Sequence, residues 1–215
     1  MKPARQDKRR NHRRDPERNQ ERILKAATEE FARFGLGGAR VDRIAARAGA
    51  NKRMLYYYFG NKDDLFLAVL EASYAAIRSA ERELRLEDLE PRAAMRRLVE
   101  FTWNYYLAHP EFLTLLNSEN LHRARHVRRS RKIVAMHSPF AAMIKQVLER
   151  GARGGVFRRG VDPVQLYVSI AALGYFYLSN RYTLSAIFQR ELLAPGNRKA
   201  RLKHMIELVL GYLRK

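Results

Sequence analysis

Residues 48–64 read AGANKRMLYYYFGNKDD, and this stretch decides the fold. Asn51 can cap a short helix that runs from Lys52 to Phe59, because its side chain can accept a hydrogen bond from a free backbone N–H. Gly60 ends that helix, and Asn61 can cap the next one. Two cations therefore begin a very short helix in which four consecutive aromatic residues follow.

A second short helix precedes this one, and the pair has the build of a helix-turn-helix. The pattern predicts a helix over 41–48 with its apolar residues on one side. Gly49 can adopt the positive φ that a tight turn needs. Two short helices joined in this way are typical of DNA-binding units, in which the second helix enters the major groove and turns its first residues toward base edges.

The groove-facing side chains follow from that geometry. Lys52 and Arg53 would face the bases, because Arg binds guanine O6 and N7 with two hydrogen bonds and Lys reaches the same acceptors. Tyr56 and Tyr57 lie one turn further, where a hydroxyl reaches a phosphate or a base edge. We expect Tyr58–Phe59 to point into the core.

The whole chain agrees with an anionic partner. Its 215 residues carry a formal net charge of +20, which favours nucleic acid first and acidic lipid second.

The chain has no cysteine, so disulfides and thiolate metal sites are excluded, and a reducing cytoplasm fits. The charged N-terminus predicts no secretory signal, and the uncharged run 163–180 fits a buried helix better than a membrane span.

The remaining pattern is helical throughout. A basic, disordered tail is expected over 1–16 and a DNA-binding domain over 17–62, leaving 63–215 for a larger bundle. No run alternates as a strand would, so the predicted fold is all-α. Beyond the two short helices, we expect helices near 17–34, 61–85, 91–108, 110–121, 127–151, 163–182 and 198–214.

Residues 20–70 resemble the DNA-binding domain of TetR/AcrR-type transcriptional regulators. The stretches that carry the resemblance are ILKAATEEFARFG and VDRIAARAGANKRMLYYYFGNKDDLFLAVL. The resemblance implies a homodimer with one DNA-binding head per subunit, a ligand pocket in the C-terminal bundle and a near-palindromic operator in double-stranded DNA. It also matches Lys52, Tyr56, Tyr57 and Lys62 to residues that commonly touch DNA.

The chain departs from the usual pattern of that family in three respects. Ala39 and Arg40 stand where Thr or Ser is usual, Asn51 stands where Ser is frequent, and Arg53 stands where a small residue is frequent. Arg40 is expected to bind a phosphate by charge, and Arg53 to read a base that the family often leaves unread. Neither Arg40 nor Arg53 should harm the fold, but they leave the operator sequence undetermined.

The bundle offers a dimer surface and a pocket. The helices near 163–182 and 198–214 carry apolar stripes suited to an interface across a two-fold axis, or to packing within one subunit. An aromatic set suits an unidentified, mostly hydrophobic effector, or an ordinary core. The candidate ligand-binding residues are Trp103, Tyr106, Phe112, Met136, His137, Tyr167, Tyr175 and Phe176.

Two features of the sequence also suit other functions. The charge alone would also suit a non-specific nucleic-acid-binding protein. The basic run 121–132 is either a solvated turn or an entrance for an acidic effector, and it leaves a helical-bundle enzyme with an acidic substrate as a third hypothesis. No phosphate loop, nucleophile elbow or metal-ligand spacing occurs, so we expect no enzyme, metal or cofactor. The hypothesis is a cytoplasmic, ligand-responsive repressor.

Overall fold

The computed structural model describes the backbone of residues 8–215 and the side chains from Pro16 onward. Within this range the chain is all-α, as the sequence predicts, and no β-strand occurs. It divides into two compact units: residues up to Ala72 together with Thr114–Ser130, and Ser73–Leu113 together with Arg131–Lys215. Helices α4 (Lys62–Arg82) and α6 (Pro110–Leu121) each contribute to both units.

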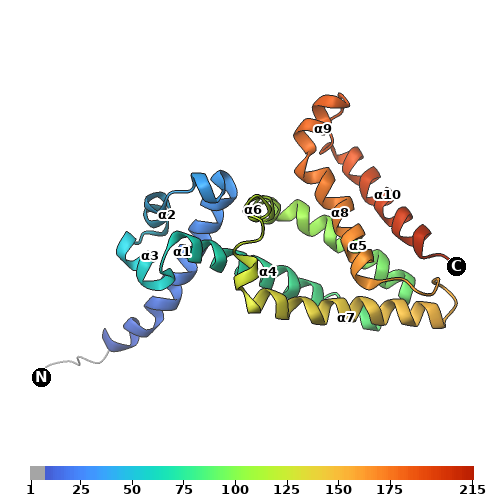
Figure 1. Cartoon of the computed structure of the whole chain (residues 1–215), viewed down its shortest axis with the longest axis horizontal. Coiled ribbons are helices and arrows are strands. Elements are labelled where there is room, and N and C mark those ends of the chain that lie inside the picture. The colour runs from blue at the N-terminus through green and yellow to red at the C-terminus, as the bar shows by residue number, and fades with distance from the viewer. Residues whose placement is uncertain (1–7) are drawn as a thin grey trace, which may run out of the picture. The chain divides into compact units, whose positions relative to one another are not determined.

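The first unit begins with α1 (Lys8–Gly38), followed by α2 (Val41–Ala48) and α3 (Lys52–Phe59) (Figure 1). The last two have the bounds that the sequence predicts. The disordered tail expected over 1–16 differs from what is seen, because α1 already begins at Lys8. Residues 1–7 of that tail lie outside the described residues.

A small core holds these helices together. Ile23 and Phe31 on α1, Ile44 on α2, Leu55 on α3 and Phe66 on α4 are completely buried. The rings of Phe31 and Phe66 meet edge to face, with centroids 5.0 Å apart. Such aromatic pairs contribute beyond their buried area, so a unit with so few apolar residues still fixes the position of α3.

Two glycines shape this unit. Gly35 has a φ of 65° and interrupts α1, where the sequence predicts the end of the first helix; a further turn reaches Gly38. Gly49 has a φ of 58° and ends α2 in the left-handed conformation expected of the turn. Phe34, next to Gly35, is 39% exposed, with the guanidinium of Arg43 4.3 Å above its ring.

The remaining helices lie mostly in the second unit, which excludes residues 114–130. The 91–108 and 110–121 helices are seen as predicted, as α5 (Pro91–Ala108) and α6. The predicted 127–151 helix is a short turn, η2 (Val127–Arg129), followed by α7 (Arg131–Arg153). The predicted 163–182 helix breaks at Asn180 into α8 (Pro163–Ser179) and α9 (Arg181–Ile187), and the last helix, α10 (Pro195–Leu213), begins before residue 198.

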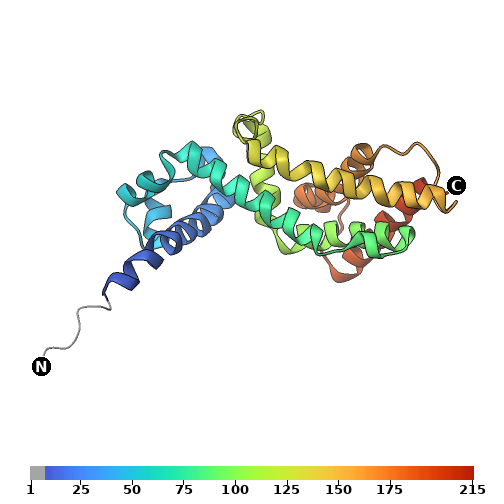
Figure 2. The same cartoon turned by 90° about the horizontal axis from the view of Figure 1, so that it is seen from below.

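Helix α5 is the centre of this unit. It packs against α7, α8 and α10, and α8 also packs against α7 (Figures 1 and 2). A short turn, η1 (Leu86–Asp88), precedes α5, and Arg150 on α7 donates hydrogen bonds to the carbonyl oxygens of Leu86 and Leu89 at 2.9 and 2.8 Å. The C-terminal half of α4 is therefore followed by a turn that α7 holds in place.

A close approach at Gly151 gives a stability prediction. A Cβ at this position would lie 2.0 Å from the ring of the buried Phe157. Gly151→Ala should therefore destabilise the protein by about 1–3 kcal/mol, or more, because the ring and its backbone must shift. The control is Gly211→Ala on α10, where a Cβ meets nothing within 4 Å and alanine favours the helix. Urea denaturation of both variants checks this, and equal midpoints would contradict it.

No helix within residues 8–215 is both long enough and apolar enough to cross a lipid bilayer.

Candidate nucleic-acid interface and effector pocket

The start of α3 is held by its own sequence. The side-chain oxygen of Asn51 accepts a hydrogen bond from the backbone N–H of Met54 at 2.8 Å, which confirms the predicted cap. Across the turn, the N–H of Ala50 bonds to the carbonyl of Ala45 at 2.9 Å, and Arg22 on α1 donates to the carbonyl of Gly49 at 3.1 Å. The helix-turn-helix is thus fixed at both sides of its turn.

Helix α3 turns one face to solvent and one to the core. Leu55 is completely buried, and the predicted core pair Tyr58–Phe59 is half-buried. Lys52 and Arg53 are exposed. Tyr56 and Tyr57 are 45% and 82% exposed, so the outer face of α3 carries two cations and two phenol hydroxyls.

The other two predicted DNA-binding residues flank this face in sequence. Arg40 is exposed at the N-cap of α2, and Lys62 is the half-buried first residue of α4. Both belong to the same compact unit as α3. Lys52 also forms an ion pair with Asp42 on α2, so it must exchange one anionic partner for another to reach DNA.

A buried carboxylate fixes the backbone at Arg40. Glu30 on α1 accepts hydrogen bonds from the backbone N–H of Arg40 at 3.0 Å and from Nε of Arg43 at 2.6 Å. Burial would raise the pKa of this carboxyl, but the hydrogen bonds from Arg43 and Arg40 outweigh burial and leave the pKa below its usual value. The contacts therefore persist through neutral pH and are lost only in acid, as Glu30 takes up a proton.

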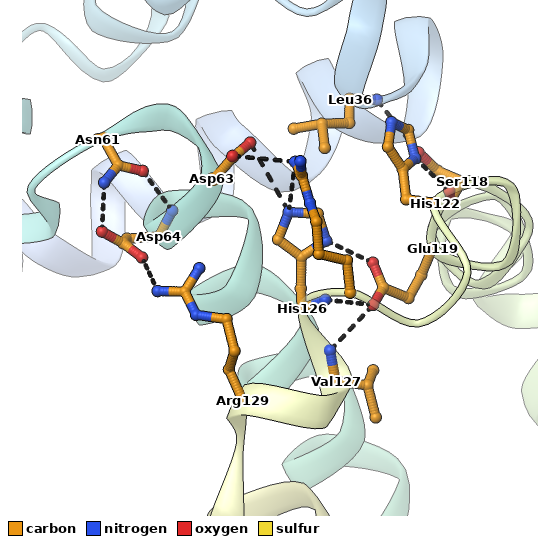
Figure 3. Close-up of polar contacts among 11 residues, drawn as sticks. Leu36, Asn61, Asp63, Asp64, Ser118, Glu119, His122, His126, Val127 and Arg129 are labelled. Carbon is orange, nitrogen blue, oxygen red and sulfur yellow. Dashed lines mark hydrogen bonds and ion pairs between the residues drawn. The ribbon is translucent and has the colours of Figure 1, made fainter.

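A second buried carboxylate organises the segment that follows α6. Glu119 accepts hydrogen bonds from the backbone N–H groups of His126 and Val127 at 2.8 and 2.9 Å, and its other oxygen lies 2.6 Å from Nδ1 of His126 (Figure 3). The ring of His126 is completely buried and packs edge to face on Phe66 of α4, with centroids 5.0 Å apart. One carboxylate thus closes the loop that carries the basic run.

The basic run 121–132 meets the start of α4. Arg125 donates to Asp63 at 3.0 Å. Arg129 donates to Asp64 at 2.6 Å (Figure 3). The Asn61 side chain also caps the start of α4, because its oxygen accepts a hydrogen bond from the backbone N–H of Asp64 at 2.9 Å. Two of the basic side chains are thus paired with carboxylates of the head, rather than wholly solvated or aimed at an effector entrance.

The Glu119 cluster yields a stability prediction. Glu119→Gln places an amide N–H₂ against groups that themselves donate hydrogen bonds, so we expect a loss of about 1.5–3 kcal/mol in the free energy of unfolding. Glu149→Gln, an exposed position on α7, is the matched control and should change it by less than about 0.5 kcal/mol. Urea denaturation and amide hydrogen exchange at 126–127 measure the effect. An unchanged midpoint with unchanged exchange would show that the cluster contributes nothing.

Part of the predicted aromatic set comes together in the second unit. Tyr106 on α5 stacks on Phe112 of α6, with centroids 6.1 Å apart. Tyr74 on α4, which the sequence analysis did not select, meets both Phe112 and His137, at 5.7 and 5.3 Å. Burial lowers the pKa of His137, which keeps its ring neutral at pH 7.

The other members of that set lie elsewhere. Trp103 is buried against Tyr177, and Met136 lines a cleft on α7. Tyr175 is half-buried. Phe176 is 59% exposed on the outer side of α8 and is not brought together with the pocket residues. Because α8 is apolar almost all round, its sequence could not indicate which side faces inward.

Sequence reasoning missed a buried arginine–glutamate pair beside this cluster. Arg78 and Glu81 on α4 are each 2% exposed, and Nε of Arg78 lies 3.0 Å from Glu81. Arg78 also donates to the hydroxyl of Tyr167 at 3.0 Å. The signal that could have found them is their spacing, because they continue the buried face of α4 that includes Leu70 and Ile77.

Helices α8 and α10 each leave apolar side chains uncovered. Val164, Val168 and Phe176 repeat every four or eight residues along α8 and are all exposed. Leu208 and Tyr212 do the same on α10. The stripe that the sequence suggested on the last helix instead packs within the subunit; it consists of Leu202, Met205, Ile206, Val209 and Leu213, of which all but the half-buried Leu202 are buried.

Among the residues whose side chains are described, no three His, Asp or Glu side chains are grouped so that they could hold a metal ion.

The chain matches two family models. Residues 23–69 match the one described as bacterial regulatory proteins, tetR family, and residues 91–209 match the one described as tetracyclin repressor-like, C-terminal domain. The first match contains α2 and α3 with the turn between them. The second covers more than half of the chain.

Named relatives agree with these matches. The chain is 40% identical over 199 residues to the HTH-type transcriptional repressor NicS of Pseudomonas putida, covering 93% of this chain and 94% of NicS. It is 44% identical over 108 residues to the HTH-type transcriptional repressor SCO4008 of Streptomyces coelicolor, which is 50% of this chain and 53% of that protein.

Solved structures show the same fold. The transcriptional regulator SCO4942 from Streptomyces coelicolor has a TM-score of 0.70 and 25% identity, over 91% of this chain and 98% of that one. The ketosteroid transcriptional regulator KstR2 of Mycobacterium tuberculosis has a TM-score of 0.66 and 20% identity, over 91% and 95%. The likeness to KstR2 concerns the fold alone.

Proposed function

The chain belongs to the TetR family of bacterial regulatory proteins, and from this premise we propose that it is a transcriptional repressor that a small effector releases from its operator. The observation that carries the proposal is the outer face of α3, where Lys52, Arg53, Tyr56 and Tyr57 stand exposed on a helix whose other side is anchored by Leu55. Such a helix suits the major groove, with the cations at base edges and Arg40 and Lys62 at phosphates.

The proposed assembly is a homodimer through α8 and α10. The exposed apolar side chains on these two helices support it, because apolar side chains repeated along one helix are covered favourably by a partner. A two-fold dimer presents two copies of α3, which suits a near-palindromic operator with half-sites about one helical turn apart.

Release by an effector would work through the separation of the two heads. An effector that binds more tightly to the form with the wider head spacing lowers DNA affinity by that difference in affinity. Helix α4 is the proposed transmitter, since it begins in the DNA-binding unit and ends beside the aromatic cluster of the other unit. The proposal gives the chain no catalytic role and a place in the cytoplasm, where its DNA would be.

Selection of bound fragments from random DNA tests the proposal, followed by footprinting in the presence of competitor DNA. A repressor of this kind protects a near-palindrome and binds it as a dimer. A non-specific nucleic-acid-binding protein would enrich no sequence and protect no defined site. Sedimentation of the free protein gives the oligomeric state independently, and a monomer without sequence preference at physiological salt would end the proposal.

A further inference from the structure

The guanidinium of Arg78 is a buried charge with spare hydrogen-bonding capacity. It lies 4.1 Å above the ring of Phe140, its Nε faces Glu81 and its Nη2 donates to Tyr167. An arginine has five N–H donors, of which two are on Nη1. Among the residues whose side chains are described, Nη1 has no hydrogen-bond partner.

An unpaired, buried N–H of a cation is costly, and it calls for an acceptor. Glu81 does not fully neutralise the charge of Arg78, because burial raises the pKa of the Glu81 carboxyl to about 8. Arg78 and Arg82 offset only part of that rise. Near pH 7 the pair therefore carries a net positive charge inside the bundle. This is the electrostatic setting in which an anion gains most from entering.

A cleft lies beside this residue. It has a volume of about 250 Å³ and is lined by Arg78 and Arg82 of α4 and by Phe140 and two methionines of α7, Met136 and Met143, with Glu87 and Pro139 completing its wall. Its size is just below that of pockets for drug-sized ligands, so it suits a small molecule. Methionine side chains adapt to the shape of what they contact, and an aromatic ring offers a flat wall.

We propose that this cleft binds a small carboxylic acid with an apolar body, whose carboxylate pairs with Nη1 of Arg78 while its body lies against Phe140, Met136 and Met143. The inference rests on the proposed function, because it names the chemical class of the effector. A monoanion fits better than a phosphate dianion, since Arg78 supplies a single guanidinium and Glu81 already lies 3.0 Å from its Nε.

The experiment measures direct binding to the full-length protein without DNA. Benzoate, phenylacetate, cinnamate and hexanoate are each compared with their own carboxamide by calorimetry and thermal shift. At least one acid should bind at least tenfold more tightly than its amide, because the amide lacks the charge. Arg78→Gln should weaken the binding of that acid on the order of 10- to 100-fold. Arg82→Gln removes the same charge from the exposed rim of the same cleft and should change binding much less.

The outcomes separate this inference from the function on which it rests. If acids and amides bind alike to the unaltered protein, or if no acid binds, the inference is overturned whether or not Arg78→Gln folds. Equal losses in Arg78→Gln and Arg82→Gln would also overturn it, since a diffuse positive field would then explain binding. If an acid binds through Arg78 but no DNA sequence is selected, the site stands and only the proposed repressor function fails.

Discussion

The double variant Lys52→Ala/Arg53→Ala is expected to lose about 2–6 kcal/mol of operator affinity, which is roughly 30- to 20,000-fold, provided that each side chain reads a base and the two losses add. Both side chains extend from the first turn of α3 into solvent, so their removal keeps the core around Leu55 intact. Fluorescence anisotropy with the selected DNA measures the loss, and thermal denaturation checks that the variant folds as the parent does.

A control of equal charge distinguishes base reading from general attraction. Lys145→Ala/Arg159→Ala removes two exposed cations from the other compact unit and should reduce affinity only slightly, by an amount that salt screens. The α3 variant should also lose its preference for the operator over unrelated DNA. If both double variants weaken all DNA equally, α3 does not read the sequence.

The second large effect concerns stability and pH. Glu81→Gln is expected to stabilise the protein by on the order of 3 kcal/mol near pH 7, and by more at pH 8. The pKa of Glu81 is raised by burial to about 8, against an ordinary value near 4.5. Below that ordinary value both the folded and the unfolded chain hold the proton, so Glu81 has no pH-dependent effect there. As the pH rises toward 8, the unfolded chain releases the proton and the folded chain keeps it, which favours unfolding. A neutral glutamine of the same shape removes this penalty.

Urea denaturation of the parent and of Glu81→Gln between pH 4.5 and pH 8.5 measures the effect. The gap between the two midpoints should open with rising pH and level off near pH 8. Glu149→Gln, which is exposed on α7, should show no such gap. A gap that is constant with pH, or a destabilised Glu81→Gln, would mean that the folded protein keeps Glu81 ionised beside Arg78.

The short helices of the head were open to prediction because their signals are local. Asn51 caps α3 through its own neighbour Met54, and Gly49 takes the left-handed conformation that ends α2. Each signal involves residues within a few positions along the chain, so it depends little on distant contacts. For the same reason Tyr57, which was expected to face the DNA groove, is exposed to solvent.

The long helices of the bundle were harder, because burial there depends on what packs against them. Helix α8 is apolar almost all round, so its pattern could not show that Phe176, which was chosen as part of the aromatic set, is exposed. Helix α4 carries Arg78 and Glu81 on its buried face, and a pattern based on apolar spacing does not detect them. The paired arginines of the basic run meet carboxylates more than sixty positions away in sequence.

By itself, the sequence determined the helical class, the helix-turn-helix and which side chains of α3 face outward, since caps, glycine turns and short-range periodicity are properties of neighbouring residues. Only the tertiary structure decided that Arg78 lies buried beside Tyr167 with an open donor, and that Glu119 closes the loop over Phe66. The physical reason is that the free energy of a charge depends on the groups that exclude water around it, and the folded chain brings these together from distant positions.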